Sequence, residues 1–270
     1  MFGLMFRGFV VGVMETVPGV SGSTVAMILG IYEKLIENLS LLTTKERKRA
    51  YPFLFVFCIG MVIGFGCSLF FIDLLLTNYR MPTLIFFVGI IFGFLPYLGR
   101  DTLELAHGRL SIRHFSIFII FLSLVAFGQS LNVVSELDVG NLSAYHYVFL
   151  ISVGFIASTA LVLPGISGAL ILTIFGVYEF AKDALLQLQI PIVLSIGSGV
   201  FLGVLISSKF IRFLLQNYKV ETYCAMVGLV TGSIYAILHH VQFDLNLPMM
   251  ISSMVTFFLG VSVSIVLMER

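Results

Sequence analysis

Two short stretches contain the residues whose types and spacing suit them to bind an anion. Residues 18–22 read PGVSG and are followed by GIYE at 30–33, and residues 164–168 read PGISG and are followed by GVYE at 176–179. Both stretches lie inside apolar sequence. A proline–glycine break in such sequence ends one membrane helix and starts another, and matched breaks in two halves indicate the binding site of a transporter. We therefore predict a two-repeat transporter whose site lies where the two breaks meet.

The backbone and hydroxyl groups just after each break are suited to hold one small anionic group. A half-helix that begins there directs free N–H groups and the positive end of its dipole at one point, and helix N-termini bind phosphate readily. Glycine allows tight turns and a close approach of a ligand to the backbone. The alternative is that both breaks are helix kinks packed by small residues. The predicted phosphate-binding residues are Gly19, Ser21, Gly22, Ser23, Thr24, Gly165, Ser167 and Gly168.

Five charged residues are further candidates for ion coupling or for contact with the anionic headgroup. Glu15 precedes the first break in apolar sequence, where an ionisable residue indicates function, and Arg7 is its candidate partner. Glu15 either couples transport to protons or only pairs with Arg7. Glu33 and Glu179 follow the repeated tyrosine and are expected near the ends of half-helices. Arg212 lies at the predicted cytoplasmic end of a span, where it either meets a phosphate or extends toward the headgroups.

The composition of the chain is that of an integral membrane protein. Hydrophobic residues make up 59% of the chain and charged residues 11%, against about half and about a quarter in soluble domains. The mean hydropathy is +1.08. A net charge of +1 gives no reason to expect a nucleic acid as partner. The sequence predicts neither a metal site nor a cofactor.

The expected fold is an all-α integral membrane protein with one membrane domain built from two similar halves. Each half is predicted to contain a re-entrant helical hairpin, which holds the break, followed by three transmembrane helices. Repeat 1 is expected at about 1–134 and repeat 2 at about 145–270. The hairpin arms are predicted at residues 5–17, 23–38, 147–163 and 169–188, and the spans at 53–77, 84–98, 115–131, 192–215, 223–238 and 250–268.

The duplication extends beyond the breaks and predicts an orientation. An odd number of spans in each half inverts the second repeat relative to the first. With the N-terminus inside, twelve Lys and Arg residues lie at the cytoplasmic side and only Arg80 and Lys182 lie clearly outside, which is a strong positive-inside bias. Both termini are therefore predicted to be cytoplasmic. The residues that recur in the duplication beyond the breaks are Gly60, Gly64, Asn78, Tyr79, Gly89 and Gly93 in the first half and Gly199, Gly203, Asn217, Tyr218, Gly228 and Gly232 in the second.

Two other functional classes, an intramembrane enzyme and a transporter or channel for small anions, would use the same residues. An intramembrane enzyme would need a base within reach of a serine nucleophile, but the five histidines fall in loops or at the edges of spans and no HExxH motif occurs. We therefore predict a transporter and not an enzyme. An ion-coupled secondary transporter or channel for small anions would use the same helix N-termini, and it is the alternative function.

At residues 18–33 (PGVSGSTVAMILGIYE) the chain resembles a bacterial and archaeal membrane family once described only as a domain of unknown function. Residues 164–168 and 176–179 are similar to its second signature. The family is associated with polyprenyl-phosphate translocation, as in PopT-type undecaprenyl phosphate transporters. The resemblance implies a flippase of the bacterial cytoplasmic (inner) membrane that returns this lipid carrier of peptidoglycan synthesis from the outer to the inner leaflet. Its implied partners are polyprenyl phosphate, membrane lipids and, as candidate coupling ions, protons.

Overall fold

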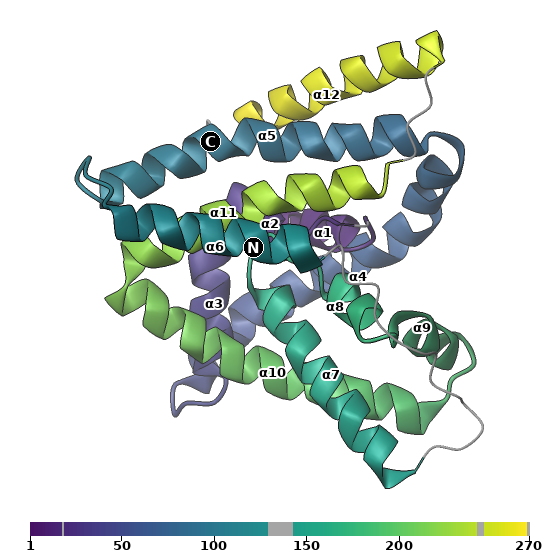
Figure 1. Cartoon of the computed structure of the whole chain (residues 1–270). Coiled ribbons are helices and arrows are strands. Elements are labelled where there is room, and N and C mark those ends of the chain that lie inside the picture. Colours follow the sequence, from purple (N-terminus) through teal and green to yellow (C-terminus); the bar gives the residue numbers. More distant parts are fainter. Residues whose placement is uncertain (18, 129–142, 242–245, 269–270) are drawn as a thin grey trace.

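The chain folds into helices joined by loops (Figure 1). The structure is a computed structural model that describes residues 1–17, 19–128, 143–241 and 246–268. Twelve helices are formed within these residues. Their bounds are α1 Phe2–Met14, α2 Gly22–Ile28, α3 Tyr32–Leu41, α4 Arg47–Asn78, α5 Arg80–Leu105, α6 Ile112–Gly128, α7 Ala144–Val162, α8 Gly168–Ile174, α9 Tyr178–Leu186, α10 Ile190–Asn217, α11 Lys219–His239 and α12 Leu247–Met268.

Six of the described helices are long and apolar enough to cross a membrane: α5, α7, α10, α11, α12 and the Arg47–Ser68 part of α4. Helices α1 and α6 are apolar but shorter. Five of the six predicted spans therefore fall on helices of spanning length. The sixth, at 115–131, falls on α6, and its last residues lie outside the described part of the chain. Helix α7, predicted as a hairpin arm, is itself long enough to span.

Large apolar side chains cover much of the outer surface of these helices. Phe55 and Val62 of α4, Leu194 and Phe201 of α10, and Met254 of α12 are all exposed. So much exposed apolar surface is unfavourable in water and marks a surface that another apolar phase covers. For helices of spanning length, that phase is the hydrocarbon core of the bilayer.

Glycines bring two pairs of helices into close contact. Gly12 of α1 and Gly64 of α4 each face the backbone of the other helix, and Gly199 of α10 faces the backbone of α7. A methyl group at any of these positions would overlap the facing backbone. Small residues at such positions allow the van der Waals packing that holds membrane helices together. The pairs α1–α4 and α7–α10 are among the most extensive helix contacts of the chain.

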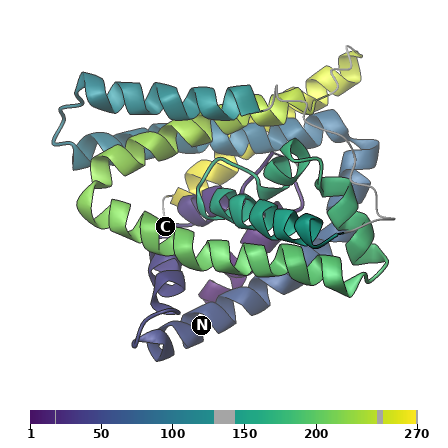
Figure 2. The same ribbon diagram turned by 60° about the horizontal axis from the view of Figure 1, so that its bottom comes forward.

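Two further pairs join the first six helices to the last six. Helix α5 packs along α12, and α6 packs along α11. Gly89 of α5 faces the backbone at Phe257 of α12, and Gly228 of α11 faces the backbone at Phe118 of α6. Figures 1 and 2 show α5, α6 and α11 together on one side of the molecule and α7 and α10 on the other. The two halves of the chain are thus packed against each other through these two helix pairs.

The segment after each break contains two short helices in place of one. The predicted arm 23–38 is divided into α2 and α3, and the arm 169–188 is divided into α8 and α9. The divisions fall at Gly30 and Gly176, which both have a φ of +66°. Glycine adopts this left-handed conformation without the steric cost that a side chain would add. The repeated GIYE and GVYE sequences therefore redirect the chain and start α3 and α9.

Candidate functional site

Each break is a tight turn that only glycine accommodates. Gly19 and Gly165 have φ values of +80° and +89°. A side chain at Gly165 would also collide with the backbone at Leu229 of α11, and one at Gly19 would crowd Ile237 of the same helix. Both turns therefore pack against α11. Pro18 of the first motif lies outside the described residues.

The polar groups of the first break are buried and contact one another. Ser21, Ser23 and Thr24 all have relative exposures of 6% or less. The hydroxyls of Ser21 and Ser23 are 2.7 Å apart and share a hydrogen bond. The backbone N–H of Gly22, at the start of α2, donates to Glu15 Oε1 at 3.0 Å. A carboxylate already lies where an anion was predicted, and this is the favourable end of a helix for negative charge.

Side chains of the first break bind the backbone of the second. Gly165 N–H donates to Thr24 Oγ1 at 2.8 Å, and Ser23 Oγ donates to the carbonyl of Leu163 at 2.9 Å. The hydroxyl of Tyr32, at the start of α3, donates to the carbonyl of Val162 at 3.1 Å. Backbone groups released at a break need partners inside the protein where no bulk water reaches them. Three side chains of the first half supply them here.

The second break differs from the first in its chemistry. Ser21 and Ser167 are the N-caps of α2 and α8, and neither makes a side-chain cap hydrogen bond. Ser167 and Gly168 are partly exposed, unlike their counterparts Ser21 and Gly22. The side chain of Leu161 lies against Gly168, where Glu15 lies against Gly22 in the first half. The two breaks therefore form an asymmetric site with its carboxylate on one side only.

A cavity of about 170 Å³ adjoins the first break. Polar groups in its lining belong to Glu15, Gly22 and Ser23 at the break and to Tyr32 and Cys58. The rest of its lining is almost entirely apolar and comes from α1, α3, α4, α7 and α10, with Phe57 of α4 and Val204 of α10 among its residues. A cavity with one polar end and apolar walls suits an amphiphile. A larger cavity of about 400 Å³ lies between α5, α6 and α11, away from the breaks.

Of the other predicted charged residues, Arg7, Glu33 and Arg212 have described side chains, and none of these three bonds to a residue of either turn. Arg7 is exposed on α1. Within the described part of the chain, Arg7 and Glu15 do not form an ion pair. Glu33 Oε1 lies 3.0 Å from Lys219 Nζ and accepts a hydrogen bond from the Tyr223 hydroxyl at 2.7 Å. Glu33 therefore joins α3 to α11 in this structure. The side chain of Glu179 lies outside the described residues.

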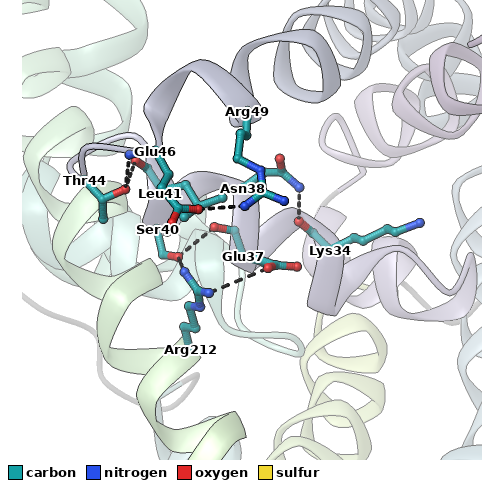
Figure 3. A network of polar contacts seen from close by, with 9 residues as sticks. All are labelled: Lys34, Glu37, Asn38, Ser40, Leu41, Thr44, Glu46, Arg49 and Arg212. Carbon is teal, nitrogen blue, oxygen red and sulfur yellow. Dashed lines mark hydrogen bonds and ion pairs between the residues drawn. The ribbon is translucent and has the colours of Figure 1, made fainter.

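Arg212 joins α10 to α3 and does not reach the breaks. Its guanidinium donates to Ser40 Oγ at 2.9 Å and lies 3.6 Å from Glu37 Oε1. Figure 3 shows Arg212 extending from α10 toward these two side chains of α3. In this structure the Arg212 guanidinium is bound to side chains of α3, and its contact with a phosphate stays a prediction.

Sequence reasoning missed three partners in these contacts. Lys219, Tyr223 and the hydroxyl of Tyr32 were not among the predicted residues. The recurrence of tyrosine before both Glu33 and Glu179 was a signal for Tyr32, and Lys219 follows a repeated Asn-Tyr pair. Tyr223 carries no such signal, because its role depends on how α3 packs against α11.

Comparisons with known proteins agree on one family. The family described as VCA0040-like, undecaprenyl phosphate translocase-like, matches residues 11–255. A polyprenyl-phosphate transporter of Staphylococcus aureus is 32% identical over 97% of this chain and 94% of its own length. A polyprenyl-phosphate transporter of Vibrio cholerae is 30% identical over 84% of this chain and 74% of its own length. No solved structure matches.

The hydrogen bond between the two breaks predicts a specific loss of stability. Thr24→Val keeps the shape of the side chain but leaves the Gly165 N–H without its acceptor. We expect the variant to be destabilised by about 1–2 kcal/mol, measured as a lower melting temperature of the purified protein in detergent. Thr24→Ser keeps the oxygen and should behave like the parent.

Thr231→Val is the matched control for that experiment. The Thr231 hydroxyl donates only to Val227 of its own helix, so its removal leaves no backbone donor unpaired. An equal loss of stability in Thr24→Val and Thr231→Val would contradict the importance of the contact between the breaks.

Proposed function

Because the chain belongs to the undecaprenyl phosphate translocase-like family, we propose that it carries undecaprenyl phosphate from the outer to the inner leaflet of the bacterial cytoplasmic membrane. The family membership confirms the resemblance found in the sequence, and with it a multi-pass membrane transporter of polyprenyl phosphate and not an enzyme. The inward direction serves the recycling of a lipid carrier after its use outside the cell.

The proposed architecture is an inverted repeat with two re-entrant hairpins and cytoplasmic termini. The order of helices α1–α6 recurs in α7–α12, including the pair of short helices after each break. The main helix pairs also correspond: α1–α4 corresponds to α7–α10, and α5–α12 corresponds to α11–α6. Such symmetry supports a mechanism in which the two hairpins open toward opposite leaflets in turn around a central site.

The hydrogen bond from Gly22 N–H to Glu15 is the observation that supports the headgroup site most directly. It places a carboxylate oxygen at the start of α2, and a phosphate oxygen is an acceptor of the same kind with more negative charge. The proposed phosphate ligands are the groups around the two turns: the backbone at Gly19, Gly22, Gly165 and Gly168 and the hydroxyls of Ser21, Ser23, Thr24 and Ser167.

Glu15 is the proposed proton-binding residue of this site. A carboxylate and a phosphate repel each other if both approach the start of α2. Loading of the substrate is therefore favoured when Glu15 takes up a proton or moves away from Gly22 N–H. Return of the carboxylate to this N–H favours release. In this mechanism protons are the coupling ion. The second break cannot act in the same way, because the position that corresponds to Glu15 is occupied by Leu161, which does not ionise.

The apolar cavity beside the first break is the proposed place for the first isoprene units of the substrate. It begins at Glu15, Gly22 and Ser23 and continues between apolar side chains of α4 and α10. A small inorganic anion would gain nothing from such walls, whereas a lipid phosphate would bury apolar surface there. The cavity therefore favours the lipid over the small-anion alternative.

Identification of the bound lipid tests the proposed substrate and site together. Protein purified in mild detergent should retain polyprenyl phosphate, detected by mass spectrometry of the extracted lipids. Ser21→Ala with Ser167→Ala should lose most of it, because one hydroxyl is removed at each break. Ser252→Ala with Ser262→Ala is the control, since those hydroxyls bond only within α12. Bulk phospholipid alone in the parent protein would favour the small-anion alternative.

A second prediction concerns the coupling role of Glu15. Glu15→Gln keeps an oxygen that accepts from Gly22 N–H but cannot ionise. We expect transport of polyprenyl phosphate into proteoliposomes to lose its dependence on an imposed pH gradient while binding of the lipid persists. Glu46→Gln, a change at an exposed carboxylate that pairs with Arg49, is the control and should keep the dependence. An unchanged response to the gradient in Glu15→Gln would remove Glu15 from the coupling mechanism.

A further inference from the structure

The cavity beside the first break extends along helix α3. The residues of α3 that line it run from Tyr32 to Leu39. The start of α3 lies at the break, because the hydroxyls of Ser23 and Tyr32 donate to the neighbouring carbonyls of Leu163 and Val162. The cavity therefore has one end at the break and the other near the C-terminal end of α3.

An arginine of α10 lies beside that second end. Ser40, which directly follows Leu39, is buried and accepts a hydrogen bond from the Arg212 guanidinium at 2.9 Å. Val204 of α10 lines the cavity, and Arg212 follows it by eight residues. At 1.5 Å per residue this is about 12 Å along α10. Arg212 is thus separated from the Gly22 N–H but lies beside the same cavity.

The ion pair that holds Arg212 is long and exposed. Arg212 Nη2 lies 3.6 Å from Glu37 Oε1, and the two side chains are 30% and 53% exposed. The nearby pair of Arg49 and Glu46 is closer, at 2.9 Å. A guanidinium has five N–H donors, and among the described residues that of Arg212 has Ser40 and Glu37 as its partners. Since exposed ion pairs are weak, Arg212 is able to exchange Glu37 for a stronger acceptor.

A carboxylate of the chain thus lies toward each end of the cavity. Glu15 Oε1 accepts from Gly22 N–H at 3.0 Å, and Glu37 Oε1 lies near Arg212 (Figure 3). A phosphate monoester carries more negative charge than a carboxylate and accepts two parallel N–H bonds from one guanidinium. The groups at both ends therefore suit the same anionic headgroup.

The sequence of the other half lacks the arginine site. Counted from the repeated Asn-Tyr pairs, Arg212 corresponds to Asp73, and counted from the repeated tyrosines of GIYE and GVYE, Glu37 corresponds to Asp183. An arginine and a glutamate therefore correspond to two aspartates. In an inverted repeat, a site that occurs in one half only lies toward one leaflet only.

We propose that Arg212 and Ser40 form a second binding site for the phosphate headgroup, which the lipid occupies on the cytoplasmic side before its release into the inner leaflet. With cytoplasmic termini, the C-terminal end of α3 faces the cytoplasm. Glu37 pairs with the guanidinium when the headgroup is absent. This inference rests on the substrate and the orientation of the proposed function.

The two sites are occupied in succession by one lipid. They lie at different ends of the cavity, so a single headgroup binds at Gly22 or at Arg212 but not at both. The apolar walls between them are available to the first isoprene units in either position. Because the second site lies toward the cytoplasm only, it favours movement of the lipid in the inward direction.

Binding of a short lipid phosphate tests the exchange at Arg212. Farnesyl phosphate, which has the same type of headgroup on a shorter isoprenoid chain, is titrated into the protein purified in detergent. Glu37→Gln removes the competing carboxylate at an exposed position, and its melting temperature shows whether the fold is kept. We expect this variant to bind farnesyl phosphate about fivefold more tightly than the parent.

The gain in affinity should depend on Arg212. Arg212→Gln should weaken binding several-fold, and addition of Glu37→Gln to it should cause no further change, because the carboxylate then has no guanidinium to compete for. Such non-additivity distinguishes direct competition from two independent effects.

Glu221→Gln is the matched control for Glu37→Gln. Arg113 Nη2 lies 3.6 Å from Glu221 Oε1, the same separation as in the Arg212 pair, but neither residue lines the cavity beside the break. This variant should bind farnesyl phosphate like the parent. Farnesol, which has no phosphate, should bind equally to the parent and to Glu37→Gln.

Inorganic phosphate distinguishes a lipid headgroup from a free anion at this site. We expect no comparable gain for inorganic phosphate in Glu37→Gln, because the apolar walls contribute only to binding of the lipid. An equal gain would assign the site to free phosphate and overturn its role in lipid release.

Two further results would overturn the second site, and they differ in what they say about the substrate. Unchanged binding of farnesyl phosphate in Glu37→Gln, or a gain that persists in the absence of Arg212, would reject the second site and leave the proposed substrate intact. A parent protein that does not bind farnesyl phosphate would reject the proposed substrate and the second site together.

Discussion

The structure depends on one constraint: the backbone groups released where the chain breaks inside an apolar region need partners within the protein. Side chains of the first half supply these partners to the backbone of the second half. Thr24 accepts from Gly165, Ser23 donates to the carbonyl of Leu163, and Tyr32 donates to the carbonyl of Val162. These contacts hold the two breaks together, and the close packing of α11 against both turns fixes their position. The side chains that satisfy the breaks, those of Ser23, Thr24 and Tyr32, are themselves buried.

This constraint also applies to the proposed headgroup site. The N–H of Gly22 is bound to Glu15 here. In the proposed mechanism a phosphate oxygen takes the place of the carboxylate, so that this N–H has an acceptor both with and without the substrate. An unpaired donor in this region would carry a cost of a few kcal/mol, which would make the empty transporter unstable. Exchange of acceptors avoids this cost.

Much of the fold followed from hydropathy and duplication, because the length of an apolar segment and the recurrence of glycines are properties of the sequence itself. The positions of α4, α5, α10, α11 and α12 were predicted in this way. The division of each predicted hairpin arm was not, because glycines such as Gly30 and Gly176 also occur within helices. The pairing of Glu33 with Lys219 and Tyr223 also escaped prediction, since it depends on the packing of α3 across the halves. The contact of Glu15 with Gly22 links residues on either side of a turn whose geometry the sequence does not specify.

A structure of the protein with undecaprenyl phosphate bound would be the most direct test of the proposed headgroup site. We expect the phosphate to lie at the start of α2, within hydrogen-bonding distance of Gly22 N–H and a serine hydroxyl. We also expect that the Glu15 carboxylate has left that N–H, and that the first isoprene units enter the apolar cavity beside Phe57. A phosphate bound among the basic residues at 45–49, with Glu15 still on Gly22 N–H, would contradict it.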